Sequence, residues 1–207
     1  HLLGYKERWF VLNIFRHAGF TLIELIVALA IFSVLVALGL PSFKVWTQNA
    51  QIRTAAGAVQ NGLQLARGEA VRRNALVRFQ LTDSIDNSCA LSTTDTNWVI
   101  SFDDPTGACA GAFLNEAFLI SDATNNPAPR IIQKRPAAEG SSRVLASANQ
   151  SVIVFNGLGR ADAAATIDLN PSVGACTAFR CLRVTVSTGG QIRMCDTNLP
   201  TGDPQAC

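Results

Sequence analysis

Gly19-Phe20-Thr21-Leu22-Ile23-Glu24 is a polar-to-apolar junction that opens an apolar run ending at Leu40. A helix rises about 1.5 Å per residue, so a run of this length can cross roughly 30 Å of hydrocarbon. Glu24 lies inside the run, where an unpaired ionised carboxylate costs about 3 kcal/mol or more. We therefore expect the Glu24 carboxylate to have a partner.

Basic residues precede the apolar run. Lys6, Arg8 and Arg16 lie on its N-terminal side, and such residues keep that end of a first span in the cytoplasm. The sequence thus predicts a single membrane span, with the C-terminal domain in the periplasm or at the cell exterior. Six cysteines without a CxxC motif suit disulfides in that oxidising compartment better than a metal site.

Charge and histidine content exclude several function classes. The chain has 17 basic and 15 acidic residues, a formal net charge of +2, far from the balance of a dedicated nucleic-acid-binding domain. Both histidines, His1 and His17, precede the junction. This removes Ser-His, Cys-His and histidine-ligated metal chemistry from the region after Gly19. We expect no enzyme, no cofactor and no metal site.

Hydrophobic periodicity predicts one long helix followed by strands. Apolar residues recur at three- and four-residue steps from Phe20 to about Asn74. Pro41 separates a membrane half, residues 20–40, from an amphipathic half, residues 41–74. The period then changes to two, and residues 75–207 read as a sheet domain. Strands are expected at 75–81, 98–102, 130–133, 151–155, 166–169, 181–187 and 191–195, with a variable loop over 121–143.

The fold class predicted from this pattern is α+β, with a long N-terminal transmembrane helix packed on an antiparallel sheet. Its best hairpin signal is Thr188-Gly189-Gly190. If Ser187 pairs with Gly190, Cys181 comes beside Cys195 within about one residue, which favours a cross-strand disulfide if the Cα separation allows one.

That pairing leaves the partners of the other four cysteines to be assigned. Cys176 would then bond to Cys207 and hold the C-terminal tail, while Cys89 and Cys109 bracket the strand around Trp98 and are expected to pair. The sequence leaves one alternative open, the sequential pairing of Cys176–Cys181 and Cys195–Cys207.

Gly19-Phe20-Thr21-Leu22-Ile23-Glu24-Leu25 resembles the class III signal junction of type IV pilins and type II secretion pseudopilins. The resemblance implies that residues 1–19 are a leader, that a prepilin peptidase cuts between Gly19 and Phe20, and that the new Phe20 amine is methylated. It also implies that Glu24 pairs with the N-terminal amine of a neighbouring subunit during assembly. Such a contact would supply the partner that a buried carboxylate needs.

Later segments are similar to the GspH/FimT group of this class. The helix end Leu63–Asn74 and the strand and turn Val152–Arg160 carry the likeness, and the ending around Cys181, Cys195 and Cys207 is similar to FimT/FimU-type minor pilins. The resemblance implies a type IV pilin-like fold and a minor pilin at or near the filament tip, with other major and minor pilins as partners. It also implies insertion in the inner membrane with a periplasmic C-terminal domain before entry into the extracellular pilus. The alternative is a GspH-like minor pseudopilin of a type II secretion system.

Some FimT-like members bind DNA through a Gly-Arg-x-Arg hairpin motif. Here the aligned residues are Gly190-Gln191-Ile192-Arg193, so Gln191 replaces the first arginine and one phosphate-neutralising cation is lost. The resemblance still implies a candidate DNA contact used in uptake, formed by Arg180, Arg183 and Arg193. A solvated strand face is the other interpretation of these arginines.

Overall fold

The computed structural model describes residues 20–207, with the side chains of all of these except residues 40 and 41. The predicted leader, residues 1–19, lies outside the described residues, and so does Gly19 of the predicted cleavage site. The chain divides into two compact units, residues 1–41 and residues 42–207.

Helix α1 (Leu22–Arg73) has nearly the predicted length and continues through Pro41. Its C-terminal end is a Schellman motif, in which the Asn74 N–H donates to Val71 O and the Ala75 N–H donates to Ala70 O. Asn74 adopts the left-handed conformation (φ 48°) that this motif requires, and asparagine tolerates it better than most residues. The helix therefore ends at Arg73, because Asn74 adopts the conformation that terminates it.

Among residues 20–207, eight strands form two antiparallel sheets instead of the single predicted sheet. Sheet A has the order β3-β2-β1-β5 and sheet B the order β4-β6-β7-β8. In sheet A the strands are β1 (Val77–Thr82), β2 (Asn97–Ser101), β3 (Ile131–Arg135) and β5 (Val152–Phe155). In sheet B they are β4 (Val144–Ala148), β6 (Ala165–Pro171), β7 (Leu182–Val186) and β8 (Ile192–Asp196).

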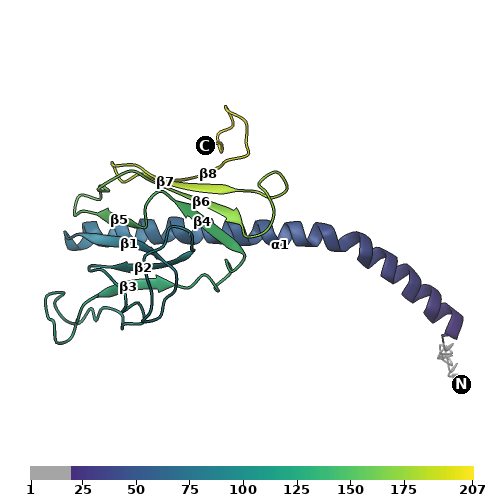
Figure 1. The fold of residues 1–207 in the computed structure, drawn as a ribbon, viewed down its shortest axis with the longest axis horizontal. Helices are drawn as coiled ribbons and strands as arrows, with labels where there is room; N and C mark the ends of the chain where they lie inside the picture. The colour runs from purple at the N-terminus through teal and green to yellow at the C-terminus, as the bar shows by residue number, and fades with distance from the viewer. Residues whose placement is uncertain (1–19) are drawn as a thin grey trace, which may run out of the picture. The chain divides into compact units, whose positions relative to one another are not determined.

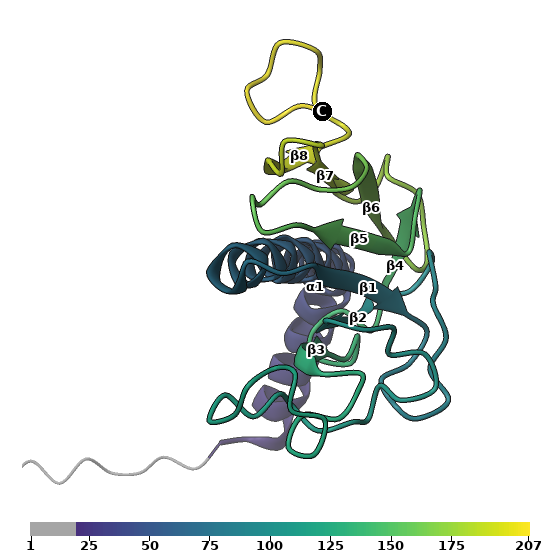
Figure 2. The same ribbon diagram turned by 90° about the vertical axis from the view of Figure 1, so that its left-hand side faces the viewer.

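Within residues 42–207, the two sheets lie along the distal part of α1, sheet A on one flank and sheet B on the other (Figures 1 and 2). The buried apolar residues of the helix recur at the predicted three- and four-residue steps. They join side chains from both sheets in one core cluster, so the helix and the sheets fold as one body. The helix part of that cluster is Ile52, Ala55, Ala56, Val59, Leu63, Ala66 and Ala70.

Strand β4 was not predicted. Three of its five residues are Ala146, Ser147 and Ala148, which have little intrinsic preference for strands. The strand forms because it pairs along its whole length with β6. Its other edge accepts residues 93 and 94, since the N–H groups of Ala146 and Ala148 donate to the Thr94 and Thr93 carbonyls. Tertiary pairing here overrides local propensity.

The predicted hairpin register is wrong by one residue. Ser187 pairs with Gln191 instead of Gly190, because its N–H donates to Gln191 O at 3.0 Å. The ladder therefore places Arg183 opposite Cys195, and Cys181 is two residues further along its strand. Diagonal cross-strand neighbours lie about 7–8 Å apart, too far for a disulfide.

The predicted bonds Cys181–Cys195 and Cys176–Cys207 are accordingly replaced by Cys176–Cys181 and Cys195–Cys207. This is the sequential alternative. The third bond joins Cys89 to Cys109, as expected from the sequence.

Candidate functional site

The first part of α1 presents its apolar side chains to the outside. Leu22–Gly39 has a mean hydropathy of 2.7, none of it is buried in the chain, and it is long enough to cross a membrane. Among residues 20–207 this is the one helix with these properties. Apolar surface of this extent needs lipid or other helices around it.

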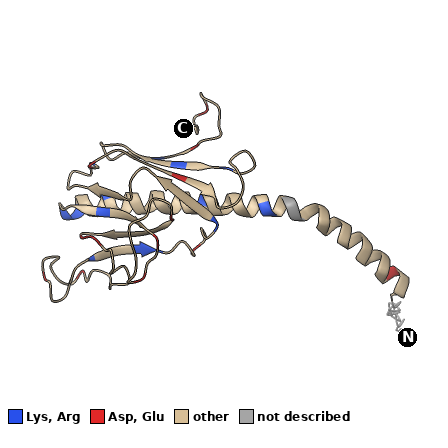
Figure 3. Ribbon diagram, viewed as in Figure 1, with Lys and Arg blue, Asp and Glu red and all other residues tan. Residues whose placement is uncertain are grey.

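Glu24 is the one charged residue between Phe20 and Lys44 (Figure 3). Its backbone N–H donates to Thr21 Oγ1 at 3.3 Å, so Thr21 is the N-cap of α1 and Glu24 occupies the third helical position. A Thr-x-x-Glu sequence at a helix start is the capping-box signature, a signal that the sequence interpretation missed. The cap fixes the start of the helix, so the Glu24 carboxylate lies in the first helical turn.

The side chains of Phe20 and Glu24 are both exposed, Phe20 by 82%. Within residues 20–207 the Glu24 carboxylate has no ion-pair partner in its own chain.

The three candidate DNA-binding arginines all have partners inside the chain. Arg183 makes two hydrogen bonds to Asp168, at 2.5 and 2.9 Å, and these hydrogen bonds raise the pKa of the Arg183 guanidinium. Arg180 Nε lies 2.5 Å from Asp196 Oδ2. These two cations are neutralised by acids that no sequence motif identifies. Arg183 lies opposite Asp168 in the β6–β7 pair, whereas Arg180 lies just before β7.

Arg193 has a different kind of partner. Its guanidinium donates to the carbonyls of Pro204 and Ala206 in the C-terminal tail, both at 3.2 Å. The tail also forms an isolated parallel bridge between Ala206 and Asp196 and is bonded covalently through Cys207. Arg193 therefore helps to hold the tail beside β8.

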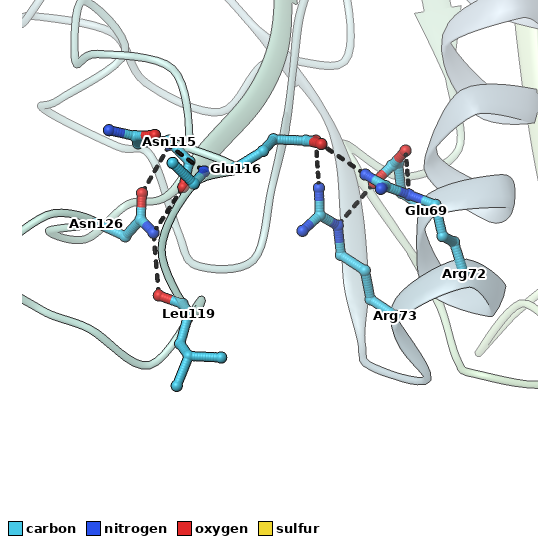
Figure 4. A network of polar contacts seen from close by, with 8 residues as sticks. Glu69, Arg72, Arg73, Asn115, Glu116, Leu119 and Asn126 are labelled. Carbon is cyan, nitrogen blue, oxygen red and sulfur yellow. Dashed lines mark hydrogen bonds and ion pairs between the residues drawn. The ribbon is translucent and has the colours of Figure 1, made fainter.

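The connection between β2 and β3 is tied to the end of α1 by four charged residues (Figure 4). Glu69 accepts hydrogen bonds from Arg72 and Arg73, each at 2.7 Å, and Glu116 accepts from the same two arginines at 2.9 and 2.6 Å. The contacts of Glu116 span more than forty positions of sequence. They fix the connection against the helix from which it is distant in the chain.

A buried asparagine orders the same connection from within. Asn126 is 3% exposed. Its amide donates to the carbonyls of Asn115 and Leu119 and accepts from the Asn115 N–H (Figure 4). Part of the predicted variable loop 121–143 is thus ordered by hydrogen bonds, and strand β3 (Ile131–Arg135) lies within it. In the described part of the chain, no three His, Cys, Asp or Glu side chains gather as a metal site would require.

Two family models match the chain. The family described as Type II transport protein GspH matches residues 55–190, and the prokaryotic N-terminal methylation motif matches residues 14–40. The second match contains Thr21, Glu24 and most of the apolar span, and the first contains the helix end and most of the sheet domain. No curated protein matches the chain.

Two solved structures are similar, both of the type IV minor pilin FimU of Pseudomonas aeruginosa (strain PAO1). The crystal form in space group P21 is 16% identical, covers 78% of this chain and 98% of its own, and has a TM-score of 0.46. The form in space group P65 is also 16% identical, covers 75% and 98% of the two chains, and has a TM-score of 0.43.

Proposed function

This chain belongs to the GspH family of minor pilins and pseudopilins, and from that premise we propose that it is a minor pilin assembled into a type IV pilus. Its role is physical. The apolar part of α1 packs among the helices of other pilins, while the sheet domain is displayed at the surface of the filament.

The observation that carries this proposal is the exposed apolar helix with a single carboxylate close to its capped start. After cleavage between Gly19 and Phe20, the new amine lies four residues before Glu24. An amine of one subunit and the Glu24 carboxylate of another can then neutralise each other in a low-dielectric environment, where each alone is costly. The pairing selects a defined axial offset between adjacent helices, which a uniform apolar surface cannot do.

The proposal extends to the enzyme that processes the chain and to the position of the subunit in the filament. We propose that a prepilin peptidase removes residues 1–19 and methylates Phe20, in keeping with the methylation motif over residues 14–40. We place the subunit at or near the filament tip, where a minor component can start assembly. The domain is held in the periplasm until incorporation.

A test separates these parts in the native host. Mass spectrometry of sheared filaments should find a peptide that begins with methylated Phe20, and antibody labelling should be confined to filament ends. Full-length chain that keeps residues 1–19 and stays in the membrane would contradict the proposal.

The second candidate function is a pseudopilin of a type II secretion system. The description of the matching family, a type II transport protein, favours it. Deleting the gene decides between the two, since loss of surface filaments with normal export indicates the pilus, and loss of exported enzymes with normal filaments indicates the secretion system.

DNA contact by Arg180, Arg183 and Arg193 is a further proposal taken from the resemblance, and the contacts of these residues weigh against a strong one. Asp168 and Asp196 already neutralise two of the three cations. A phosphate would have to displace a carboxylate in each pair, so little counterion release would remain to drive binding.

A further inference from the structure

Strand β8 is the outermost strand of sheet B, and its free edge exposes main-chain groups. Figure 2 shows β8 at the border of the sheet, with the C-terminal tail beyond it. Toward β7, Ser187 pairs with Gln191 and Cys181 pairs with Thr197. Hydrogen-bonded pairs alternate along an antiparallel ladder, so Ile192, Met194 and Asp196 direct their N–H and C=O groups away from β7.

One of these three positions already binds an extended segment. The Asp196 N–H donates to Gln205 O at 2.7 Å, and its carbonyl accepts the Cys207 N–H at 3.3 Å. The outward groups of Ile192 and Met194 have no such partner within residues 20–207. Their side chains pack against the core, so the strand is held rigidly while its edge stays available.

A groove of about 600 Å³ runs beside this edge, between the strand, the tail and α1. Leu182 and Met194 supply its apolar part. Arg180 and Asp196 also line it, but they neutralise each other in an ion pair.

Arg53 of α1 completes the lining, is exposed, and makes no ion pair among the described residues. The groove therefore carries one positive charge without a counter-charge, next to unpaired main-chain donors and acceptors.

We propose that this edge binds an extended segment of a partner subunit, which adds a strand beside Ile192 and Met194 and places a carboxylate on Arg53. Main-chain hydrogen bonds supply the affinity in such strand addition, and the side chain in the groove supplies the selectivity. A second copy of β8 fits less well, because its only acid, Asp196, is 4% exposed and already paired with Arg180. This surface is made of residues from 42–207 alone, so it goes beyond the proposed packing of the apolar segment Leu22–Gly39.

Amide hydrogen exchange at single-residue resolution tests the proposal. The full chain is extracted from membranes of its host together with its partners and compared with the same chain purified alone in the same detergent. The amides of Arg193 and Cys195 face β7 and should exchange slowly in both samples. The amides of Ile192 and Met194 should exchange at least about tenfold more slowly in the partner-bound sample. Equal rates in the two samples would overturn the proposal.

Slowing that appears in the purified chain and grows with its concentration would also overturn it, because the occupant would then be a second copy. The experiment is independent of the pilus proposal, since incorporation into filaments can succeed while Ile192 and Met194 stay unprotected.

Two pairs of variants separate the parts of the site. Arg53→Glu should abolish the added protection and Arg53→Gln should weaken it, because only the first repels a carboxylate. Met194→Pro removes one outward N–H without removing a bond to β7 and should also abolish the protection at Ile192, whereas Met194→Leu should retain it. Peptide mapping of the three disulfides checks that each variant folds. Unchanged protection in Arg53→Glu would contradict the role given to the carboxylate.

Discussion

Gly190 and Gly159 belong to two different turns and are in direct backbone contact. A Cβ atom placed on Gly190 would lie 1.9 Å from the carbonyl oxygen of Gly159. The same carbonyl accepts a hydrogen bond from Arg67 Nε of α1 at 3.1 Å. The turn after β5 is thus held between the helix and the β7–β8 hairpin, and it connects sheet A to sheet B at this end of the domain.

The first prediction tests that contact. Gly190 also has a φ of +81°, so Gly190→Ala should lower the free energy of unfolding by about 2 kcal/mol or more, from backbone strain and the clash together. Gly189→Ala is the matched control, because its Cβ would come no closer than 3.7 Å to Ser187 Oγ and should change stability by about 0.5 kcal/mol or less. Denaturant unfolding of the full chain in detergent measures both. Equal effects of the two substitutions would refute the contact.

The second prediction concerns acid stability. Burial raises the pKa of Glu69, but the hydrogen bonds from Arg72 and Arg73 together lower it by more. The pKa of Glu69 is therefore below its ordinary value of 4.5. A lowered pKa contributes stability that is present above about pH 4.5 and is lost as the pH falls through the folded-state pKa.

Glu69→Gln should therefore lower stability by about 1–2 kcal/mol at neutral pH and flatten the loss of stability below pH 4.5. Thermal unfolding between pH 3 and pH 7 checks this, with Glu139→Gln as the control, because Glu139 is exposed and lies 3.7 Å from its arginine. An unchanged pH profile in Glu69→Gln would contradict the prediction.

The third prediction concerns the disulfides. Trypsin cuts after Arg180, Arg183 and Arg193. The structure predicts that residues 161–180 are linked to residues 181–183, and that residues 194–207 form a separate peptide with an internal bond. Non-reducing mass spectrometry distinguishes this from the crossed pairing, in which all three peptides would be joined. Recovery of one triple-linked species would contradict the structure.

The fourth prediction concerns DNA. Since Asp168 neutralises Arg183, Asp168→Asn should release the cation, raise DNA affinity and steepen its salt dependence by about one unit of slope. Arg183→Gln should change the DNA affinity of the parent chain little, because Asp168 already neutralises the Arg183 charge. Gel shifts of the full chain between 50 and 200 mM salt measure both. A clear loss of binding in Arg183→Gln would mean that Arg183 contacts DNA in spite of its ion pair.

Long periodic elements could be predicted from the sequence, and elements that depend on pairing could not. Helix α1 and strand β5 lie close to their expected bounds because apolar periodicity and end signals coincide there. Strand β4 escaped prediction because its alanines carry little preference of their own.

In the candidate site, too, some features could be predicted from the sequence and others could not. The position of Glu24 within the apolar run is visible in the sequence, and the Thr21 cap could have been found from its spacing. The partners of Arg183 and Arg180 could not be found in this way. The Arg183 contact depends on the register of β6 and β7, and Arg180 lies before β7 where no pattern places it. The hairpin register estimated from the turn was one residue out, which also led to the wrong pairing of Cys181 with Cys195.

The central claim is that the Glu24 carboxylate makes an intermolecular pair during assembly. Glu24→Gln keeps the size and helical preference of the side chain and removes its charge. Thr21→Ala removes the helix cap and leaves the charge, so it separates a defect in the start of the helix from a defect in pairing.

The decisive measurement is the amount of each variant in sheared filaments relative to the amount in the membrane of the native host. We predict that Glu24→Gln is made and processed normally but enters filaments at least about tenfold less, as expected from the loss of a pair worth more than about 1.4 kcal/mol, whereas Thr21→Ala enters at close to the parent level. Incorporation of Glu24→Gln at the parent level would contradict the account.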